Sequence, residues 1–246
     1  MAALRPLLAT DRLSRSFGGL KAVDNVDFCL AEGETRALIG PNGAGKTTLV
    51  SLICGRIPAS TGRVLLEGRD ISRLPAHKRV RQGIAYTFQI TSIFANLSVL
   101  DNVALAAQRQ FLDERSSSRG RVEQISLDAL AQVGLAPYAL QRAGSLSYGH
   151  QRLVEVAMGL ALRPRLLILD EPTQGLSDGE IETFIALIRA VGEFTTVLLI
   201  EHNMDVVMAL AERITVMDQG RVLAEGTRDE IRANPAVQRA YLGSVR

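Results

Sequence analysis

The fold is decided by one stretch of the sequence, Gly40-Pro41-Asn42-Gly43-Ala44-Gly45-Lys46-Thr47. It matches the pattern G-x-x-x-x-G-K-[ST] of a phosphate-binding loop, the P-loop. The apolar run 35–40 before it is typical of a buried strand, and residues 46–53 have the pattern of a helix. The motif therefore lies in the strand–loop–helix context that it requires.

The residue types of this loop suit a nucleotide. Its glycines let backbone N–H groups converge on phosphate oxygens without Cβ clashes, and the following helix adds its positive N-terminal end. We expect Lys46 to reach the β- and γ-phosphates, and the Thr47 hydroxyl to bind Mg²⁺. A glycine-rich turn that matches the pattern by accident is the alternative. The strand and helix around the motif favour the P-loop.

A second motif is the hydrophobic run Leu166-Leu167-Ile168-Leu169-Asp170-Glu171, a strand that ends in two carboxylates. Pro172 follows, and a turn there can bring both carboxylates toward the phosphate-binding edge of a sheet. Asp170 is then a water-mediated ligand of Mg²⁺. Glu171 is the best candidate for the general base that activates an attacking water, a role that contributes about 10²–10⁴-fold in rate. Its alternative role is to cap a surface loop.

Short apolar runs alternate with helical patterns along much of the chain. The predicted buried strands are 35–40, 165–170 and 195–201, and the predicted helices are 46–53, 148–162 and 178–191. This alternation predicts an α/β fold, a P-loop NTPase core with a mostly parallel sheet. Residues 8–14 and 23–30 read as antiparallel strands of an N-terminal β subdomain, and residues 214–217 and 222–225 flank a hairpin turn at Asp218-Gln219-Gly220.

The middle of the chain, about 90–162, is predicted to be a mostly helical insertion. Ser98, with Asp101 three residues later, forms a capping box for a helix that we expect to reach Phe111. Residues 113–121 are polar and rich in serine and arginine, so they predict an exposed connection between helices.

Composition excludes several classes of protein. The chain has 246 residues with 28 Lys+Arg against 26 Asp+Glu, a net charge of +2, which argues against nucleic-acid binding through a basic surface. No uncharged apolar run approaches the roughly 18 residues of a membrane span, and the start of the chain has no secretion signal. Cys29 and Cys54 lie far apart without metal-ligand spacing, as in a reduced cytosolic protein. We expect a soluble cytosolic chain.

A third motif carries a resemblance to a family. The residues Leu146-Ser147-Tyr148-Gly149-His150-Gln151 resemble the signature sequence LSGGQQ of the ATP-binding subunits of ABC transporters, and the other motifs follow in that family's order over nearly the whole chain. The resemblance implies the ABC ATPase fold, ATP and Mg²⁺ as ligands, and hydrolysis of ATP. It also implies that the signature binds the γ-phosphate of ATP held by another subunit, so two complete sites need a head-to-tail dimer.

Three single residues match further motifs of this family. Gln89 matches the Q-loop glutamine, which senses Mg²⁺ or the attacking water, and His202 matches the switch histidine that contacts the γ-phosphate. Phe17 matches the aromatic that stacks on adenine, with a core role in the β-ribbon as its alternative. The resemblance thus implies catalytic roles for Glu171, His202 and Gln89. It places ATP on Phe17 and on Gly40, Pro41, Asn42, Gly43, Ala44, Gly45, Lys46, Thr47 and Thr48, and Mg²⁺ on Thr47, Gln89 and Asp170.

The same resemblance predicts a division of the chain. Residues 1–246 form one ABC ATP-binding domain, with a RecA-like core and β subdomain over about 1–90 and 163–246, and a helical subdomain over about 91–162. Three positions depart from the family pattern: Tyr148 replaces the first signature glycine, His150 the usual glutamine, and Ser177 the aspartate that often ends the D-loop. Because Ser147 and Gly149 are kept, we expect contact with phosphate to survive.

The subfamily is indicated by longer matches, which resemble the ATPases of branched-chain or hydrophobic amino-acid importers. These matches are Gly83-Ile84-Ala85-Tyr86-Thr87-Phe88-Gln89, residues 97–103, Glu201-His202-Asn203-Met204 and residues 239–243. The ATPases of lipopolysaccharide export and of urea or amide importers are alternatives, because an ATP-binding subunit does not contact the solute. The implied partners are a second ATP-binding subunit, identical or different, transmembrane permease subunits and, for an importer, a periplasmic solute-binding protein. The implied location is the cytoplasmic face of the membrane.

Ile90, Ile93, Phe94 and Leu97 offer an apolar contact for permease helices, or else belong to the core of the insertion. A soluble ABC ATPase that acts on ribosomes or DNA is an alternative of a different class. Such proteins usually carry two cassettes or a long coiled-coil insertion, and the sequence shows neither. The signature and His202 argue against a P-loop kinase.

Overall fold

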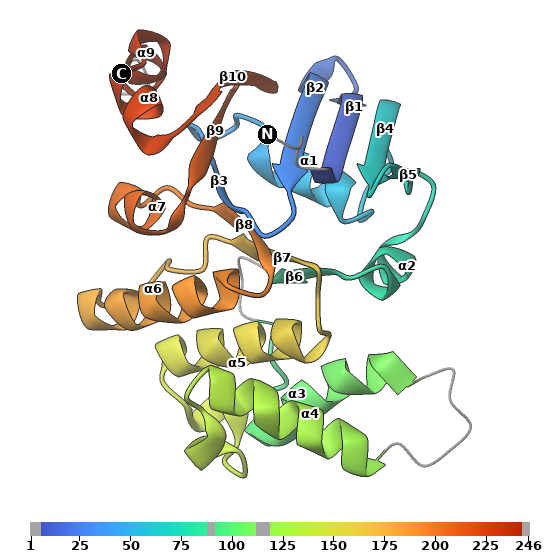
Figure 1. Ribbon diagram of the computed structural model, residues 1–246, viewed down its shortest axis with the longest axis vertical. Helices are drawn as coiled ribbons and strands as arrows, with labels where there is room; N and C mark the ends of the chain where they lie inside the picture. The colour runs from blue at the N-terminus through green and yellow to red at the C-terminus, as the bar shows by residue number, and fades with distance from the viewer. Residues whose placement is uncertain (1–5, 88–91, 112–118, 243–246) are drawn as a thin grey trace.

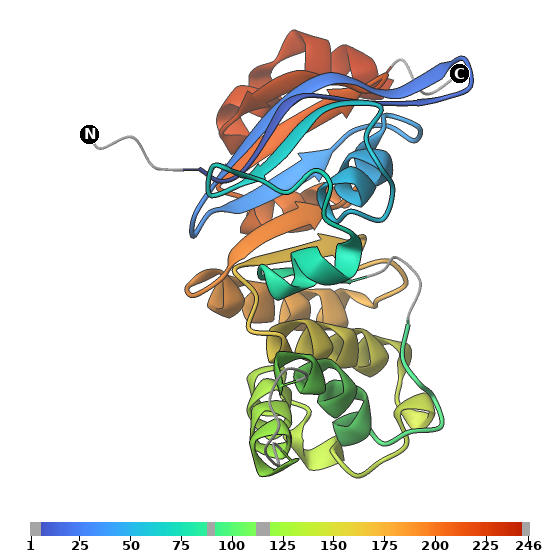
Figure 2. The same ribbon diagram turned by 90° about the vertical axis from the view of Figure 1, so that its right-hand side faces the viewer.

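Two β-sheets and a group of helices make up the described part of the chain, which covers residues 6–87, 92–111 and 119–242 of this computed structural model (Figure 1). The sheets occupy one end of the molecule and the helices α3, α4 and α5 the other (Figures 1 and 2). No helix within these residues has both the length and the apolar character that crossing a membrane demands.

The six-stranded sheet carries the nucleotide motifs and has the order β10-β9-β3-β8-β7-β6. The strands are β3 (Thr35–Ile39), β6 (Ile84–Thr87), β7 (Leu166–Asp170), β8 (Thr196–Ile200), β9 (Arg213–Asp218) and β10 (Arg221–Gly226). Five of them run parallel, and only β10 pairs antiparallel, with β9. Every residue of β3, β7 and β8 is buried, which explains why their sequences are continuous apolar runs. The predicted fold class is confirmed.

A four-stranded antiparallel sheet, of order β2-β1-β4-β5, lies beside this core. Its strands are β1 (Pro6–Phe17), β2 (Leu20–Ala31), β4 (Thr61–Leu66) and β5 (Arg69–Asp70). Helix α1 (Lys46–Ile53) packs between the two sheets, where its leucine and isoleucine side chains share one buried cluster with residues of both. Strands β1 and β2 extend beyond the predicted ranges 8–14 and 23–30, because their hairpin continues pairing up to Phe17 and Leu20.

Helices cover the other face of the six-stranded sheet. These helices are α6 (Asp178–Gly192) and α7 (Met204–Leu210). Further along the chain, α8 (Arg228–Ala233) and α9 (Pro235–Leu242) follow β10. The remaining helix, α2 (Ala76–Arg81), precedes β6. Phe184 and Ile188 of α6 belong to a buried cluster that also contains Leu167 and Leu199 of the sheet. The ends of the predicted buried strands and helices agree with the structure to within one residue.

The helical group consists of α3 (Val99–Ala107), α4 (Arg119–Gln132) and α5 (Tyr148–Ala161), with short 3₁₀ helices at Gln108–Phe111, Ala136–Tyr138 and Ala143–Ser145. The prediction of one helix up to Phe111 was wrong at its end, because the last four residues form a tighter 3₁₀ turn. The Ser98 hydroxyl does cap α3, accepting from Asp101 N at 3.0 Å. The capping box itself is not formed, because the Asp101 carboxylate accepts from that hydroxyl and not from the Ser98 backbone.

The predicted exposed connection over residues 113–121 falls mostly on residues 112–118, which lie outside the described residues. Its last three residues were predicted wrongly. They form the first turn of α4, which begins at Arg119. Exposed helical turns are as polar as exposed loops, so the polar composition of residues 119–121 did not distinguish a helix start from a loop.

Candidate functional site

The P-loop joins β3 to α1 at the carboxyl end of the parallel strands. Its three glycines all have positive φ angles, 150° at Gly40, 79° at Gly43 and 100° at Gly45, a region that L side chains rarely adopt. At two of them a side chain has no room, since a Cβ would lie 2.2 Å from Met217 O at Gly40 and 2.3 Å from Ala22 O at Gly45. The loop therefore depends on glycine for both conformation and close approach.

Lys46 begins α1 and turns its side chain back over the loop. Its ammonium donates hydrogen bonds to the carbonyl oxygens of Gly40 at 2.7 Å and of Pro41 at 3.1 Å. Burial lowers the pKa of this ammonium, and the carboxylates of Glu171 and Asp170 act in the opposite direction. Lys46 thus places a positive charge inside the loop, and the two carboxylates at the end of β7 favour its charged form.

Asp170 ends β7 with its side chain inside the protein, where only 2% of the residue is exposed. Its carboxylate accepts a hydrogen bond of 2.6 Å from the Tyr86 hydroxyl on the neighbouring strand β6. Burial raises the pKa of Asp170, and the hydrogen bond from Tyr86 partly counteracts that rise. A buried carboxylate with one donor beside the P-loop has the chemistry that a divalent cation requires.

Tyr86 was missed by the sequence reasoning, which used Tyr86 only as part of a family match. The signal was its position, because a phenol at the end of an otherwise apolar strand needs a polar partner when it is buried. That partner is 84 positions further along the chain.

Glu171 follows Asp170 with a φ angle of 47°, in the left-handed region that is uncommon for residues other than glycine. Its backbone N–H donates to Ile200 O at 2.8 Å, so the residue leaves β7 while it is still attached to β8. Strained backbone of this kind is concentrated at functional sites. The turn predicted at Pro172 thus begins at Glu171.

His202 lies directly after β8, and 61% of its side chain is exposed. The loop that carries it is held by Glu201, which is 1% exposed and accepts from the backbone N–H groups of His202 at 2.9 Å and of Asn203 at 3.1 Å. The other carboxylate oxygen of Glu201 accepts from Thr173 N at 3.1 Å and from the Thr173 hydroxyl. Glu201 therefore fixes the loops after β7 and β8 to each other. The sequence reasoning gave it no role.

The signature residues form the start of α5. Ser147 caps this helix, since its hydroxyl accepts from His150 N at 3.3 Å, and Gln151 donates from its side chain to Leu146 O at 3.0 Å. A Cβ on Gly149 would lie 2.2 Å from Oε1 of Glu180 in the first turn of α6. A side chain on Gly149 would therefore require the Glu180 side chain to move. The φ angle of Gly149 is not in the left-handed region.

The departures from the family pattern have local partners. The Tyr148 ring is 43% exposed, lies beneath the Arg152 guanidinium at 5.4 Å and would contact a Cβ on Gly175 at 3.1 Å. The His150 ring lies 5.0 Å from the Tyr138 ring. Ser177 is the N-cap of α6, and its backbone N–H and its hydroxyl donate to the Glu180 carboxylate at 2.9 Å and 2.7 Å.

Phe17 ends β1 at the turn of the first hairpin and is 46% exposed, with the Arg15 guanidinium 4.6 Å from its ring centre. The core role that was its alternative is therefore not observed. Ala22 on the returning strand β2 touches the P-loop, because its carbonyl is the atom nearest to a Cβ on Gly45. The hairpin end thus lies close to the phosphate-binding loop.

Two residues singled out in the sequence, Gln89 and Ile90, lie outside the described residues. Of the other apolar candidates, Phe94 and Leu97 are 56% and 37% exposed, whereas Ile93 packs against the core of the helical group. Ile93 therefore contributes to the insertion core. Phe94 and Leu97 remain available for contact.

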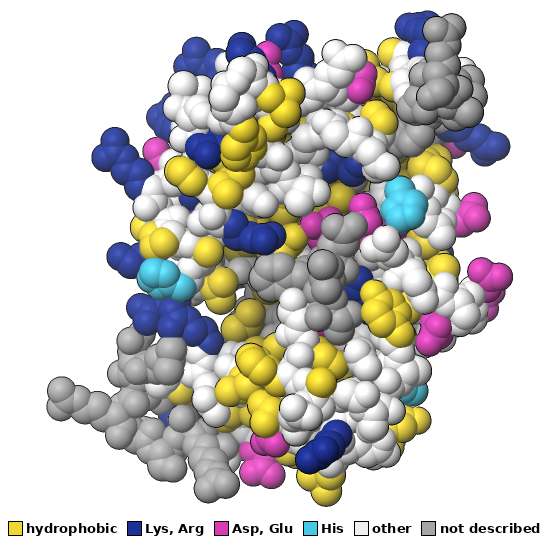
Figure 3. All heavy atoms as spheres, turned by 180° about the vertical axis from the view of Figure 1, so that it is seen from behind, with side chains coloured by type: hydrophobic (Ala, Val, Ile, Leu, Met, Phe, Trp, Pro, Cys, Tyr) yellow, Lys and Arg dark blue, Asp and Glu magenta, His cyan; other side chains and the backbone are white. Residues whose placement is uncertain are grey.

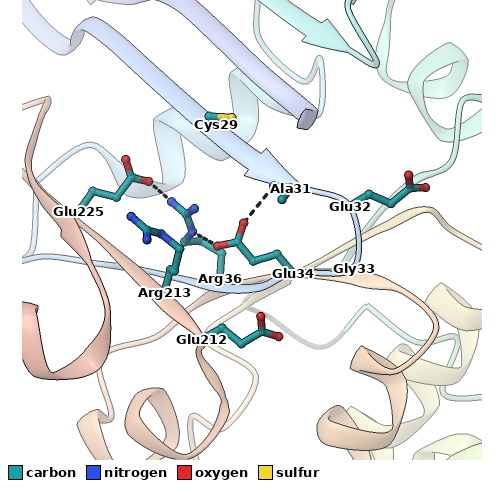
Figure 4. Close-up of a pocket in the computed structure, with 9 residues that line it drawn as sticks. All are labelled: Cys29, Ala31, Glu32, Gly33, Glu34, Arg36, Glu212, Arg213 and Glu225. Atoms are coloured by element: carbon teal, nitrogen blue, oxygen red, sulfur yellow. Dashed lines mark hydrogen bonds and ion pairs between the residues drawn. The ribbon is translucent and has the colours of Figure 1, made fainter. Parts of the chain in front are cut away.

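A pocket of about 420 Å³ lies away from these motifs, between the end of β2 and strands β3, β9 and β10 (Figure 4). Its central side chain, Arg36, is 4% exposed and donates to Glu34 at 2.5 Å, to Thr215 at 3.0 Å and to Glu225. Glu34 also accepts from Ala31 N at 3.0 Å. This buried network joins the sheets, and none of the predicted site residues lines the pocket.

Comparisons with known proteins agree with these motifs. Residues 23–174 match the family described as ABC transporter, and residues 221–245 match the family described as branched-chain amino acid ATP-binding cassette transporter. The chain is 39% identical to the high-affinity branched-chain amino acid transport ATP-binding protein BraF of Pseudomonas aeruginosa, and 40% identical to LivG of Salmonella typhimurium, with 98% of this chain and 99% of each relative covered. It is 36% identical to the lipopolysaccharide export system ATP-binding protein LptB of Escherichia coli, over 96% of this chain and 97% of LptB.

Solved structures show the same relationship. A nucleotide-free ATP-binding cassette from an ABC transporter superposes with a TM-score of 0.87 at 28% identity, covering 96% of this chain and 98% of that one. A dimeric cassette bound to ADP and Pi superposes with a TM-score of 0.78 at 25% identity, covering 89% and 98%. With its P-loop, acidic strand end and signature helix on this fold, the chain belongs to the ABC transporter family, as one of its ATP-binding, ATP-hydrolysing subunits.

Proposed function

We propose that this chain hydrolyses ATP to power the import of branched-chain amino acids. The assignment of the solute rests on the 39–40% identity of this chain to BraF and LivG over nearly their full length, because the names of these two proteins state that transport. The match of residues 221–245 to the branched-chain amino acid cassette family supports the same solute. The lower identity of 36% to LptB makes lipopolysaccharide export the second candidate.

The P-loop binds the phosphates of ATP in this proposal. Backbone N–H groups of residues 40–48, except Pro41, which has none, and the N-terminus of α1 would bind the β- and γ-phosphates, and Lys46 would add its ammonium. Gly45, the N-cap of α1, has no side chain that could cap the first turn, so those N–H groups are available to phosphate oxygens. Phe17 offers its exposed ring to the adenine.

Thr47, Asp170 and Gln89 hold Mg²⁺ in this proposal. The two of them that the structure describes fit a hard cation, because a hydroxyl on the first turn of α1 and a buried carboxylate are both oxygen ligands. Bound Mg²⁺ would supply positive charge that neutralises the phosphates. The Tyr86 hydroxyl donates to the Asp170 carboxylate and orients it.

Glu171 is the general base. It takes a proton from water as the water oxygen bonds to the γ-phosphorus, and the bond from that phosphorus to the bridging oxygen of ADP breaks. The left-handed backbone at Glu171 turns its carboxylate out of β7 beside Asp170. His202 contacts the γ-phosphate from a loop that Glu201 holds in place.

The second half of each site comes from another ATP-binding subunit. The N-terminus of α5, with Ser147 and Gly149, binds the γ-phosphate that the partner's P-loop holds, and the dimeric cassette among the solved structures supports such an assembly. The helical subdomain, about residues 91–162, presents this end of α5. Permease subunits, and a solute-binding protein on the far side of the membrane, complete the transporter, so the chain works at the cytoplasmic face.

The contact with the permeases uses the helical half of the molecule. Figure 3 shows hydrophobic side chains over both halves of this face, with one group of them in the lower half. Phe94 and Leu97 are exposed apolar side chains in the segment before α3. Exposed apolar groups of this size favour a protein partner.

The chemistry is tested by two substitutions and a control. Lys46→Ala should abolish binding of ATP. Glu171→Gln should keep binding, lower turnover by about 10²–10⁴-fold and trap an ATP-dependent dimer on size-exclusion chromatography, because the base is lost while both phosphate contacts remain. Glu182→Gln, at an exposed position of α6, is the matched control and should behave like the wild type. Normal turnover in Glu171→Gln would contradict the role of Glu171.

The solute is tested with the complex that copurifies with this chain from membranes. Reconstituted into vesicles with MgATP inside, it should take up leucine, isoleucine and valine, and Glu171→Gln should abolish that uptake. Uptake of urea or an amide alone, or ATP-dependent extraction of lipopolysaccharide, would replace the proposed solute. Purely ribosomal association would place the chain among soluble ABC ATPases.

A further inference from the structure

The short segment 92–97, which carries Phe94 and Leu97, is attached to the helical group by its backbone. Ser92 N donates to the Glu155 carboxylate of α5 at 2.5 Å. Phe94 is held from α3, because the Asn102 side chain accepts from Phe94 N at 2.7 Å and donates to Phe94 O at 3.1 Å. Both holding residues are buried, Asn102 at 0% exposed and Glu155 at 6%.

Two further hydrogen bonds attach the same segment to the 3₁₀ turn that precedes the signature. Gly144 N donates to Ala95 O at 3.0 Å, and Ala143 N donates to Leu97 O at 2.9 Å. A Cβ on Gly144 would lie 2.9 Å from the Cβ of Ala95, which shows how closely the two backbones approach. The segment is thus bound to α3, to α5 and to the turn before α5.

Glu155 also belongs to a chain of contacts that reaches the signature. Its second carboxylate oxygen accepts from Arg152 at 2.9 Å, one turn earlier on α5, and Arg152 is 3% exposed. The Arg152 guanidinium lies over the ring of Tyr148, and that ring packs against Gly175 in the loop before α6. Burial raises the pKa of Glu155 although two donors face it, so keeping this charge inside the protein opposes folding.

A buried ion pair that links two functional surfaces calls for a reason other than stability. We propose that Glu155 and Asn102 are positioning residues that make the apolar surface of Phe94 and Leu97 move together with the signature helix α5. This inference rests on the proposed function. Binding of ATP at the signature then changes the affinity of the permease for the surface of Phe94, and permease binding changes the affinity for ATP by the same factor, because coupling between two sites is reciprocal.

The proposal is tested in the copurified complex, reconstituted in vesicles with its solute-binding protein. Glu155→Ala should lower the ratio of leucine-stimulated to basal ATP turnover by about threefold or more, and leave basal kcat and the KM for MgATP within about twofold. Glu155→Gln, which keeps an oxygen acceptor for Ser92 N, should restore part of that ratio. Glu123→Ala, at an exposed position of α4, is the control and should leave it unchanged.

An unchanged ratio in Glu155→Ala would overturn the inference. Equal loss of basal and stimulated turnover in Glu155→Ala would assign the pair a structural role and also overturn it. A wild-type complex with ATP turnover but no response to leucine would contradict the proposed solute, and the inference with it.

Discussion

In the proposed function, the P-loop and the signature both present the N-terminus of a helix to phosphate, but the two helix starts are built differently. The N-cap of α1 is Gly45, which has a left-handed conformation and no side chain to cap the helix. The N-cap of α5 is Ser147, with φ −58° and ψ 158°, and its hydroxyl accepts the hydrogen bond of His150 N. The P-loop therefore keeps its first N–H groups for a ligand, whereas the signature shares them with its own cap.

The P-loop and the signature also differ in the burial of their charged groups. Lys46 and Asp170 are buried beside the P-loop with pKa values displaced by that burial. At the signature, Tyr148 is 43% exposed, and the nearby carboxylate of Glu180 belongs to a capping box. The P-loop region therefore contains buried charges whose burial is unfavourable, as is common at ligand sites, whereas the start of α5 is an ordinary capped helix.

The largest predicted effect tests the tight packing of the P-loop. Gly45→Ala should lower the free energy of unfolding by about 3 kcal/mol or more and abolish binding of ATP, because the new Cβ meets the backbone oxygen of Ala22 at 2.3 Å. Gly43→Ala is the matched control, since its φ angle is 79° but no atom lies within 4 Å of the new Cβ. It should cost only the conformational strain, about 1–2 kcal/mol. Chemical denaturation and nucleotide titration measure both, and equal losses would disprove the packing argument.

The next effect tests the dependence of the signature on a partner. Gly149→Ala should leave the Kd of ATP at the P-loop within about twofold, and weaken the ATP-dependent dimer of the Glu171→Gln chain by about tenfold or more. The new Cβ displaces Glu180, whose hydrogen bonds to Ser177 cap α6. Gly179→Ala, which meets no atom within 4 Å, is the control. A weaker Kd in the monomer would place Gly149 in the first half-site.

A third pair of substitutions should have effects of opposite sign on stability. Asp170→Asn should raise the free energy of unfolding at pH 7, because the folded-state pKa of Asp170 is raised by burial and the ionised form opposes folding. This gain is fully present above the folded pKa and disappears as the pH falls below the unfolded value. Ser147→Ala should lower stability by about 1 kcal/mol through loss of the cap, at every pH.

Thermal unfolding of both variants between pH 3 and pH 8 measures these changes, at about 2–4 °C per kcal/mol for a chain of this size. Stabilisation of Asp170→Asn that stays constant down to pH 3 would show that the buried charge is not its source. Destabilisation by Asp170→Asn at pH 7 would contradict the difference between the two regions.

The smallest effect concerns the departure at His150. His150→Gln, which restores the residue usual in the family, removes a ring contact with Tyr138 worth about 0.5–1.5 kcal/mol. Because the cap and Gly149 are unchanged, ATP turnover should change by less than about threefold. A larger change in turnover would show that His150 takes part in contact with the partner's phosphate.

The buried strands β3, β7 and β8, the helices α1, α5 and α6, and the phosphate-binding loop were predictable because each depends on neighbouring residues. A buried parallel strand reads as an apolar run, and a P-loop reads as glycines and a lysine at set spacing. Short edge strands such as β5, and the 3₁₀ end of the helix after Ser98, were not predictable, because two to four residues carry too little pattern.

The sequence by itself determined the family, the phosphate loop, the acidic strand end and the signature, since these are continuous stretches whose residue types state their chemistry. Only the tertiary structure decided that Tyr86 supports Asp170, that Glu180 covers Gly149 and that Glu155 holds Ser92. Two of these contacts join residues 84 and 63 positions apart. A buried polar group must find a partner, but which partner it finds depends on how the strands and helices pack.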